Sequence, residues 1–475
     1  MTFDWSAEEI RRVGYRAVDL IADHLVNLPN GPVFRPVPAE LAMAFRSAPP
    51  PATGCPVDAI LDDVARDVMA YPFGNGHPRF AGWVNSPPAP IGIVAAAIAA
   101  AMNPSVAGGN QAAVHVEHAV IAWMAAVLGC SPGTGGLLVS GTSAAAITAL
   151  AVARYAACQQ RGWDVRTVGV HGVPVRLLVY ATAEGHSCHQ KAVELLGLGS
   201  ANLRTVPHDG ALRMRPDALD AMLREDLAAG HLPVAVVASA GTVNTGVIDP
   251  LDAIADICAQ HATWMHVDGA YGAPAMLLDE MRDQLAPAAR ADSISVDAHK
   301  WLYVPVDAGV VLVRDPSIMR NTFSLVPPYL RTDGDAPWFS EYGMEQTRPF
   351  RALKVWMTLR YFGLDGYRAL IAHDVAMARA LAARVRAIPD LLELWEPQSL
   401  SIVCFRARGT DDLNRAALAE LQRSGGAFVS STMLDGRFWM RACIVNPRTA
   451  EADIDALVTQ VAQVTSAVSR RLHGE

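Results

Sequence analysis

Lys300 stands in the stretch SVDAHKWLYVP (residues 295–305), where an aspartate and a histidine precede it and a mostly apolar run follows. Only three of the 39 basic residues are lysines, so arginine is the default cation of this chain. Arginine does not lose its proton in proteins, whereas a buried lysine can lose it and become a nucleophilic amine. Lys300 is therefore a candidate reactive amine, with a structural buried lysine as the alternative. The other two, Lys191 and Lys354, fall in helical patterns and are predicted to be exposed cations.

A Ser-Gly-Thr-Ser run at residues 140–143 follows the apolar stretch GGLLV and opens an alanine-rich helical pattern. Hydroxyl groups and free backbone N–H groups at a helix N-terminus bind anions, phosphate in particular. Thr142 and Ser143 are therefore candidate phosphate ligands, although either residue could simply cap the helix. The sequence contains neither GxGxxG nor GxxxxGK[ST], so it does not indicate a dinucleotide or a nucleoside triphosphate.

Two further strand-like runs end near residues with acid–base chemistry. His186 follows the run LLVYAT, and a histidine there could stack on a planar ligand or move protons. Asp268 ends the run TWMHVD, where an unpaired buried carboxylate would be costly. Each residue has an ordinary alternative. The histidine could be a hydrogen-bonded loop residue, and the aspartate could cap a helix or pair with an arginine.

Together these groups offer a phosphate-binding corner, a ring-stacking side chain, a carboxylate and an amine. Pyridoxal 5'-phosphate requires this set, because its aldehyde forms a Schiff base with a lysine and its ring nitrogen needs an acidic partner. Its phosphate needs hydrogen-bond donors such as those of a helix N-terminus. The sequence therefore predicts a pyridoxal 5'-phosphate site and no metal site.

The elements that would position these residues alternate between short β-rich runs and helical runs from about residue 76 to 370. This rhythm is typical of βαβ units, so we expect a mainly parallel sheet covered by helices on both faces. Ligand groups should then gather at the carboxyl ends of the strands. Residues 1–75 read as helices around a proline-rich segment, and residues 371–475 as a small α+β domain that ends in a helix at 449–472.

The composition excludes several classes of protein. The chain has 475 residues and a formal net charge of −8 without a basic block, which argues against nucleic acid or a membrane surface and favours a small-molecule partner. The seven cysteines are odd in number and widely spaced, so neither a disulfide framework nor a zinc site is predicted, and a reducing cytoplasm fits. The N-terminal residues read as an amphipathic helix rather than a signal peptide. The apolar stretch 91–102 is too short to span a bilayer and is predicted to be a buried helix.

The sequence resembles the group II pyridoxal-phosphate-dependent decarboxylases, the family of the aromatic-L-amino-acid decarboxylases, over nearly the whole chain. The most specific motifs are DAHKWL (297–302) and HVDGAYG (266–272), with HPRFAGW, SGTSAAAITAL and GHSC in support. This family has the fold-type I architecture, so the resemblance implies a mainly parallel seven-stranded sheet, an N-terminal helical dimerisation segment and a small C-terminal domain. It also implies a carboxy-lyase that converts an L-amino acid to an amine and CO2.

The resemblance implies a role for each matching residue. Lys300 would bind the cofactor aldehyde, Asp268 would pair with the pyridine nitrogen, and His186 would stack on the ring. Ala270 would pack against the other face of the ring. The remaining matching positions would lie near the phosphate or contact the cofactor elsewhere: Thr142, Ser143, Thr242, Asp297 and His299. Asp297 stands where animal aromatic decarboxylases commonly have asparagine, and an acid beside a phosphate is unfavourable unless a donor bridges the two groups.

Tyr329 lies in the segment VPPYLRTDGDAPWFSEYG, which has no periodicity and is typical of a mobile lid. In the family, a tyrosine on the corresponding loop protonates the carbon that has lost CO2, whereas relatives with phenylalanine there tend to form aldehydes. The resemblance therefore implies Tyr329 as a catalytic residue and favours simple decarboxylation. From the residues alone, a loop tyrosine is more often a hydrophobic anchor.

The substrate side chain is less defined. Residues 77–87 match the side-chain pocket of the family, and Phe80 and Trp83 could supply an aromatic wall. A mostly apolar pocket favours an aromatic amino acid such as tryptophan, tyrosine, phenylalanine or DOPA. Residues 103–113 are small and polar where animal aromatic decarboxylases have large rings, so a branched aliphatic side chain, glutamate or diaminobutyrate stays open.

Other functions stay open as well. An aldehyde synthase or an aminotransferase would use the same cofactor, a cysteine desulfurase would need a mobile thiol such as Cys188, and a non-catalytic protein could keep the fold as a ligand-binding module. The family precedent also implies a homodimer with the active site at its interface.

Overall fold

The computed structural model describes residues 3–325 and 338–473, which form two compact units. The central unit comprises Ser86–Arg379 and Trp395–Val403, and the terminal unit comprises Met1–Asn85, Ala380–Leu394 and Cys404–Glu475. The predicted three-part division, with boundaries at residues 75 and 370, stays a prediction. Within the described residues, no helix combines the length and the apolar character needed to cross a bilayer.

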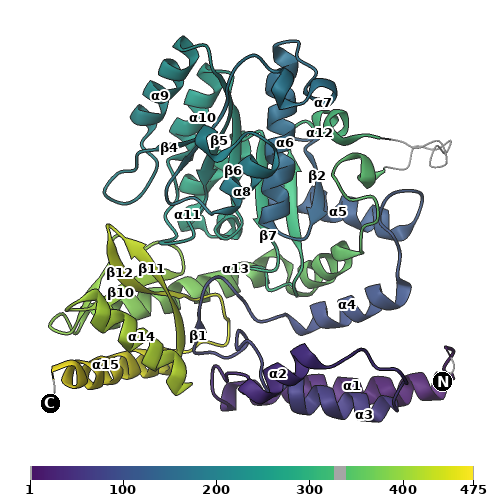
Figure 1. Ribbon diagram of the computed structural model, residues 1–475, viewed down its shortest axis with the longest axis vertical. Helices are drawn as coiled ribbons and strands as arrows, with labels where there is room; N and C mark the ends of the chain where they lie inside the picture. Colours follow the sequence, from purple (N-terminus) through teal and green to yellow (C-terminus); the bar gives the residue numbers. More distant parts are fainter. Residues whose placement is uncertain (1–2, 326–337, 474–475) are drawn as a thin grey trace. The chain divides into compact units, whose positions relative to one another are not determined.

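The central unit is built on a seven-stranded sheet with the strand order β2-β8-β7-β6-β5-β3-β4. Four neighbouring pairs are parallel, and β8 is antiparallel to both of its neighbours. The strands are β2 Gly135–Val139, β3 Leu177–Thr182, β4 Leu203–Val206, β5 Leu232–Ser239, β6 Trp264–Asp268, β7 Ser293–Asp297 and β8 Gly309–Val313. Six of them are almost continuously buried, as expected for strands that are covered on both faces. The predicted mainly parallel seven-stranded sheet is confirmed (Figure 1).

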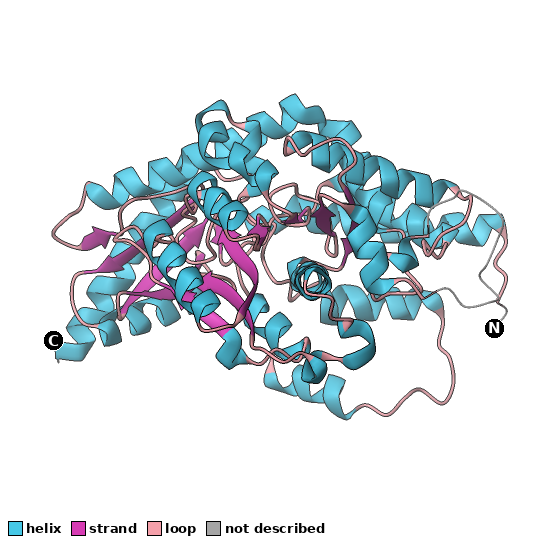
Figure 2. Cartoon of the chain, turned by 90° about the horizontal axis from the view of Figure 1, so that it is seen from above, coloured by secondary structure: helices cyan, strands magenta, loops and turns pink. Residues whose placement is uncertain are grey.

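The order of the strands explains why helices cover both faces of this sheet. The chain moves one way from β3 to β4, and then the other way from β4 to β5, β6 and β7. Because parallel crossovers are right-handed, the reversal places the later helices on the opposite face from α8 (Cys188–Leu195). The contacts agree, since α8 packs on α6 (Thr142–Gln160), whereas α9 (Pro216–Ala228) packs on α10 (Leu251–Gln260). These connecting helices are among those drawn in cyan in Figure 2.

The other helices of the chain complete the two units. In the central unit they are α4 Pro90–Met102, α5 Ala112–Val127, α7 Val165–Val168, α11 Asp279–Leu285, α12 Pro316–Phe323 and most of α13 Arg351–Arg386. In the terminal unit they are α1 Ala7–Asn27, α2 Ala39–Ser47, α3 Val57–Asp63, α14 Asp411–Ser424 and α15 Glu451–His473. The long α6 is alanine-rich, which favours the helix and lets it lie close to the sheet.

The terminal unit contains a second sheet with the order β1-β11-β12-β10-β9. Its strands are β1 Phe80–Ala81, β9 Leu392–Leu394, β10 Ile402–Ala407, β11 Phe428–Leu434 and β12 Arg437–Cys443, and the first two residues of β10 are counted with the central unit. The short β1 joins the segment that precedes the central unit to β11, and the ring of Phe80 stacks on that of Phe428 with centroids 5.1 Å apart. The N-terminal and C-terminal parts of the chain therefore share one core in this unit.

One glycine lies between the carboxyl ends of two strands that are far apart in the sequence. Gly309, the first residue of β8, is the register partner of Val139 in β2 and of Asp297 in β7. A Cβ atom at residue 309 would lie 2.5 Å from the Cα of Gly141, a distance that real side chains do not tolerate. Only glycine permits this approach, which brings the turn after β2 beside the turn after β7.

Two expectations about exposure are wrong. Helix α4 contains the stretch 91–102 that was expected to be buried, yet Val94, Ile98 and Met102 are each 43–53% exposed. The helix is apolar on every side, and the described residues bury only the side that carries Gly92 and Ala95. Lys354, expected to be exposed, is buried, and its ammonium donates to the backbone oxygen of Asp307 at 2.8 Å.

Candidate active site

The carboxyl ends of five strands carry the candidate residues. Because β8 is antiparallel to both β2 and β7, those two strands run in the same direction as β3, β5 and β6, and their carboxyl ends share one edge of the sheet. The residues follow in order: Thr142 and Ser143 after β2, His186 after β3, Thr242 after β5, Asp268 at the end of β6, and Asp297, His299 and Lys300 at and after the end of β7.

Lys300 and Asp297 form an ion pair at the end of β7. The Nζ of Lys300 lies 3.0 Å from Oδ2 of Asp297, and about a fifth of the lysine side chain is exposed. Burial favours the neutral amine, but the negative charges of Asp297 and Asp268 outweigh burial and raise the pKa of Lys300. The amine is therefore held as a cation in this arrangement, with its proton shared toward Asp297.

Asp268 is buried at the end of β6, and both of its carboxylate oxygens accept hydrogen bonds. Oδ1 accepts from the backbone N–H of Ala270 at 3.1 Å, and Oδ2 accepts from Nε2 of His189 at 2.9 Å. Burial alone would raise the pKa of Asp268, but the bond and charge of His189, followed by the charge of Lys300, hold this pKa well below its usual range. Asp268 is thus a buried carboxylate that stays ionised.

His189 is 1% exposed and occupies the second position of α8, beside Cys188. Burial would lower the pKa of His189, but the hydrogen bond to Asp268 and the neighbouring thiol raise it to about 10. The pKa of Cys188 falls to about 7, because the hydrogen bonds with His186 and His189 outweigh burial. The ring of His266 lies 6.1 Å from that of His189, and burial, with the charge of His189, lowers its pKa to about 3. The site therefore combines one cationic imidazole and one neutral imidazole within its buried floor.

The turn after β2 and the turn after β7 form a polar corner. A Cβ atom at Gly141 would lie 3.3 Å from the imidazole of His299 and 3.6 Å from Oδ1 of Asp297. The hydroxyl of Thr142 and Oδ1 of Asp297 are both buried and have no hydrogen-bond partner among the described residues. Ser143 is exposed in the first turn of α6. The N-terminus of α6 and an unsatisfied hydroxyl thus meet beside the Lys300 turn.

The turn that carries Lys300 is held by residues that flank it in the sequence. The indole N–H of Trp301 and the hydroxyl of Tyr303 both donate to Oδ2 of Asp374, at 2.9 and 2.7 Å. The hydroxyl of Ser86 donates to the backbone oxygen of His299 at 3.2 Å. Asp374 is fully buried in α13, so the lysine turn is fixed by a core helix rather than by solvent-exposed contacts.

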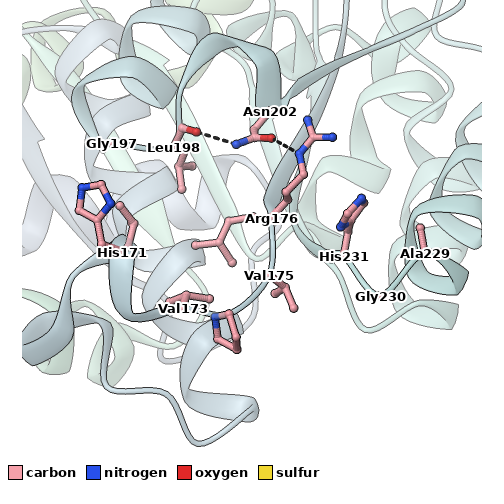
Figure 3. A pocket seen from close by; sticks show the side chains of 13 residues that line it. His171, Val173, Val175, Arg176, Gly197, Leu198, Asn202, Ala229, Gly230 and His231 are labelled. Atoms are coloured by element: carbon pink, nitrogen blue, oxygen red, sulfur yellow. Dashed lines mark hydrogen bonds between the residues drawn. The ribbon is translucent and has the colours of Figure 1, made fainter.

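A separate cavity of about 500 Å³ opens elsewhere in the central unit (Figure 3). It is lined in part by His171, Arg176, Asn202 and His231, and Arg176 donates to the side-chain oxygen of Asn202 at 2.8 Å. These residues flank the amino ends of β3 and β5, whereas the candidate residues lie at the carboxyl ends. The cavity is therefore not part of the candidate site.

Comparison with known proteins assigns the family. The model of the pyridoxal-dependent decarboxylase conserved domain matches residues 43–408. The chain belongs to the pyridoxal-dependent decarboxylase family. An aromatic-L-amino-acid decarboxylase of Bacillus atrophaeus is 33% identical, covering 98% of this chain and 97% of that protein. An L-2,4-diaminobutyrate decarboxylase of Rhizobium meliloti is 34% identical, covering 84% of this chain and 80% of that protein. The crystal structure of Oryza sativa TDC with PLP and tryptamine has a TM-score of 0.91 and 29% identity, covering 98% of this chain and 99% of that one.

These findings confirm the predicted family and the fold-type I architecture. They also identify the protein as a pyridoxal-phosphate-dependent amino-acid decarboxylase. The residues present fit this cofactor. The unsatisfied hydroxyl of Thr142 and the free N–H groups of the α6 N-terminus suit a phosphate, Asp268 offers an ionised carboxylate, and Lys300 offers an amine.

The structure brings together some of the predicted residues of this decarboxylase. Lys300, Asp268, Ala270, Asp297 and His299 lie in two adjacent turns, and Gly309 ties Thr142 to the same corner. His186 is exposed, and its Nδ1 accepts from the backbone N–H of Cys188 at 3.1 Å. Thr242 is buried after β5, with its hydroxyl 3.2 Å from that of Thr245.

The remaining predicted residues are not in the described part of the central unit. Tyr329 lies outside the described residues. Phe80 and Trp83 belong to the terminal unit, where Phe80 is 3% exposed and packs in an aromatic cluster with Phe73 and Phe428. Trp83 is 47% exposed, stacks on Phe73 with centroids 5.4 Å apart, and has a φ of 50°. The ring of Trp83 is therefore half-exposed, whereas Phe80 is a core residue of the terminal unit.

Sequence reasoning did not single out His189, although GHSCH contains two histidines. The helical pattern that begins at residue 188 gave no sign that one of its buried positions would face the end of β6. The signal that could have found His189 is a polar residue on the apolar side of a helix next to a strand that ends in a carboxylate. Such a residue needs a partner when buried.

Proposed function

We propose that this decarboxylase acts on an L-amino acid with an aromatic side chain and releases the corresponding amine and CO2. The observation that carries the aromatic preference is the half-exposed indole of Trp83, stacked on Phe73, in the segment expected to recognise the side chain. Aromatic rings favour stacked or edge-on partners and an apolar surround. The names of the Bacillus atrophaeus relative and of the tryptamine-bound Oryza sativa structure support the same choice.

We propose that the residues at the strand ends have different roles in the reaction. When bound, pyridoxal phosphate supplies an aldehyde that reacts with amines and a ring that withdraws the electron pair left by departing CO2. Lys300 provides the amine that holds this aldehyde, and Asp297 can accept the Nζ proton that the amine must lose. Asp268, ionised and buried, holds a proton on the ring nitrogen. Charges that are fixed before the reaction lower its barrier without reorganisation.

The other predicted roles are proposed as follows. Thr142, Ser143 and His299 bind the phosphate together with the N-terminus of α6, and Thr242 is a further cofactor contact. His186 and Ala270 enclose the ring from its two faces. Asp297 faces Lys300 rather than accepting a donor at Oδ1, so its contact with the phosphate requires a bridging donor.

Tyr329 is the proposed proton donor to the α-carbon after CO2 has left, acting with His186. It lies outside the described residues, and the proposal rests on the family resemblance of its segment. A tyrosine rather than a phenylalanine at this position supports the amine, not an aldehyde, as the product.

The test is to incubate the holoenzyme with a panel of amino acids and to identify products by mass spectrometry, with ammonia and peroxide measured in parallel. Tryptophan, tyrosine, phenylalanine and DOPA are compared with leucine, valine, glutamate and 2,4-diaminobutyrate. We expect amine and CO2 in equal amounts, with the highest kcat/KM for an aromatic substrate. A preference for a non-aromatic member of the panel would refute the aromatic assignment, and aldehyde with ammonia and peroxide would indicate an aldehyde synthase.

Diaminobutyrate is the second candidate substrate, because the Rhizobium meliloti relative named for it is 34% identical. Two polar side chains of segment 103–113 form hydrogen bonds within the segment or with His115 next to it. Gln111 donates to the backbone oxygens of Ser105 and Gly108, and His115 pairs with Asn110 at 3.1 Å. The amide N–H groups of Gln111 and Oδ1 of Asn110 are therefore engaged in folding this part of the chain.

We also propose that the protein is a homodimer in the cytoplasm. Exposed apolar side chains gather on single helices, as with Val94, Ile98 and Met102 on α4, and a second copy would remove them from water. Five of the seven cysteines are buried and none of the seven forms a disulfide, a state that a reducing compartment preserves. Light scattering after size exclusion should give twice the chain mass, and a monomer would contradict the proposal. Fractionation should recover the protein with cytoplasmic markers.

A further inference from the structure

His189 is buried, and its ring interacts with two neighbours, the carboxylate of Asp268 and the thiol of Cys188. Its Nε2 lies 2.9 Å from Oδ2 of Asp268, whereas its Nδ1 has no hydrogen-bond partner among the described residues. The other oxygen of Asp268 accepts from the backbone N–H of Ala270 at 3.1 Å, with Ser295 Oγ farther away at 3.5 Å. His189 is thus the single side chain that holds Asp268 at normal hydrogen-bond length among these contacts.

The charges around the ring favour this bond. The ring of His189 is faced by Asp268 and His266 from β6 and by Cys188 from its own segment, and burial keeps His266 neutral. Asp268 therefore supplies the dominant nearby charge, and the imidazolium in turn keeps the carboxylate ionised. Ligand-type atoms of Cys188, His189 and Asp268 lie within 4.8 Å of one another. The proton shared by His189 and Asp268 accounts for this proximity without an ion.

The geometry points to His189 as a positioning residue that fixes the orientation and the charge of the Asp268 carboxylate, so that Asp268 can hold a proton on the ring nitrogen of bound pyridoxal phosphate. This inference rests on the role proposed above for Asp268. His189 acts only through that carboxylate, in the way that outer residues orient metal-binding side chains. A leucine in its place would leave a buried carboxylate oxygen without a donor, which favours the protonated acid and weakens its hold on the ring nitrogen.

A cofactor analogue separates this role from simple packing. In 1-deaza-pyridoxal phosphate a carbon replaces the ring nitrogen, so the analogue cannot use a carboxylate at that position. The measured quantity is the dissociation constant of each cofactor from the full-length apoprotein, determined by absorbance titration without substrate. The ratio of the two constants reports the strength of the contact to the ring nitrogen.

The variants are H189L, H189F, H189Q and D268N, with H261L as the matched control. His261 forms a partly buried bond of similar length with Asp220, at 2.7 Å, at the far end of α10 from the candidate site. We expect H189L and H189F to bind pyridoxal phosphate about 10- to 100-fold more weakly, with little change for the analogue. H189Q, which keeps a donor, should recover most of the ratio, and H261L should leave it unchanged.

The outcomes distinguish the two proposals. If D268N keeps the wild-type ratio, the role proposed for Asp268 fails and this inference fails with it. If the ratio of dissociation constants changes in D268N but not in H189L or H189F, the role proposed for Asp268 stands. His189 is then only a packing residue. If neither nonpolar variant folds, nitrogen-15 spectra of the His189 ring at pH 8 decide. We expect an imidazolium in the wild type and a neutral ring in D268N, and a neutral ring in the wild type overturns the inference.

Discussion

The Nζ of Lys300 lies 3.0 Å from Oδ2 of Asp297, three positions earlier in the chain. The pair closes the turn after β7, and the buried Asp374 of α13 fixes the residues that follow it. A protonated amine is not a nucleophile, so Asp297 has two effects on Lys300. It keeps the amine charged in the absence of cofactor, and it offers an oxygen to which the proton can move.

Replacing Lys300 by glutamine should abolish the covalent attachment of the cofactor. We expect turnover to fall by roughly 10³-fold or more, because a neutral amide cannot act as the nucleophile. Borohydride reduction followed by peptide mapping should label residue 300 in the wild type and not in K300Q. K191Q removes an exposed lysine and should leave labelling intact. A K300Q protein that turns over at the wild-type rate would contradict the whole interpretation of the site.

Replacing Asp297 by asparagine should make the amine of Lys300 easier to deprotonate. Burial favours the neutral amine and Asp297 is the largest effect opposing it, so D297N lowers the pKa of Lys300. The rate at which apoprotein recombines with pyridoxal phosphate should therefore reach its plateau at lower pH. D307N removes the carboxylate beside Lys354 and serves as the control. An unchanged pH profile in D297N would show that Asp297 does not govern the proton of Lys300.

The bond between His189 and Asp268 stabilises the apoprotein only while His189 is protonated, so stability should fall at alkaline pH. The pKa of His189 is raised from about 6.5 in the unfolded chain to about 10 in the folded protein, so its contribution is complete below pH 6.5 and is lost as pH rises toward 10. Between pH 7 and pH 10, we expect the Tm of the wild type to fall more than that of H189Q, by roughly 2–5 °C. Equal slopes in differential scanning calorimetry would mean that His189 is neutral in the folded protein.

Replacing Tyr329 by phenylalanine should change the products. Loss of a positioned proton donor costs about 10²- to 10⁴-fold in the rate of amine formation. We expect Y329F to release aldehyde and ammonia and to consume oxygen, which an oxygen electrode and mass spectrometry would detect. Y361F changes an exposed tyrosine of α13 and should keep amine as the product. Amine formed by Y329F at the wild-type rate would remove Tyr329 from the mechanism.

Replacing Gly309 by alanine should loosen the polar corner. The added methyl group would lie 2.5 Å from the Cα of Gly141, so β8 must move away from the turn after β2. We expect a loss of about 1–3 kcal/mol in the free energy of unfolding, the usual cost of overpacking, and weaker binding of pyridoxal phosphate. G210A is the control, because a methyl group there meets no atom within 4 Å. Urea titrations of both variants would measure their free energies of unfolding. Equal values for G309A and G210A would contradict the prediction.

Much of the central sheet could be predicted because its strands are buried on both faces. Runs such as VAVVAS and DSISVD are rich in β-forming residues and end in turns. They could therefore be recognised as strands, in their order along the chain, without the structure. The edge strand β4 and the strand β11 were missed. Each is short or carries exposed polar residues, and neither has a continuous apolar run.

Residues of the candidate site could be predicted only where a chemically distinctive side chain stands at or after the end of a buried strand. Asp268 and Lys300 follow buried strands, and their chemistry is specific to one cofactor. His189 was missed because its partner is distant in the sequence, and a helical pattern does not reveal which strand end its buried side faces. The exposure of α4 was also missed, because an apolar helix looks the same in sequence whether its own chain covers it or not.

Gly309 pairs with both Val139 and Asp297, and this double pairing sets when the site can form during synthesis. Val139 and Asp297 meet only through β8, which is made after both of them. A nascent chain that has emerged only as far as β7 lacks the strand between the two turns, however complete its earlier helices are. Such long-range pairing forms slowly. The nascent chain should therefore bind pyridoxal phosphate only after residues 309–313 have emerged from the ribosome.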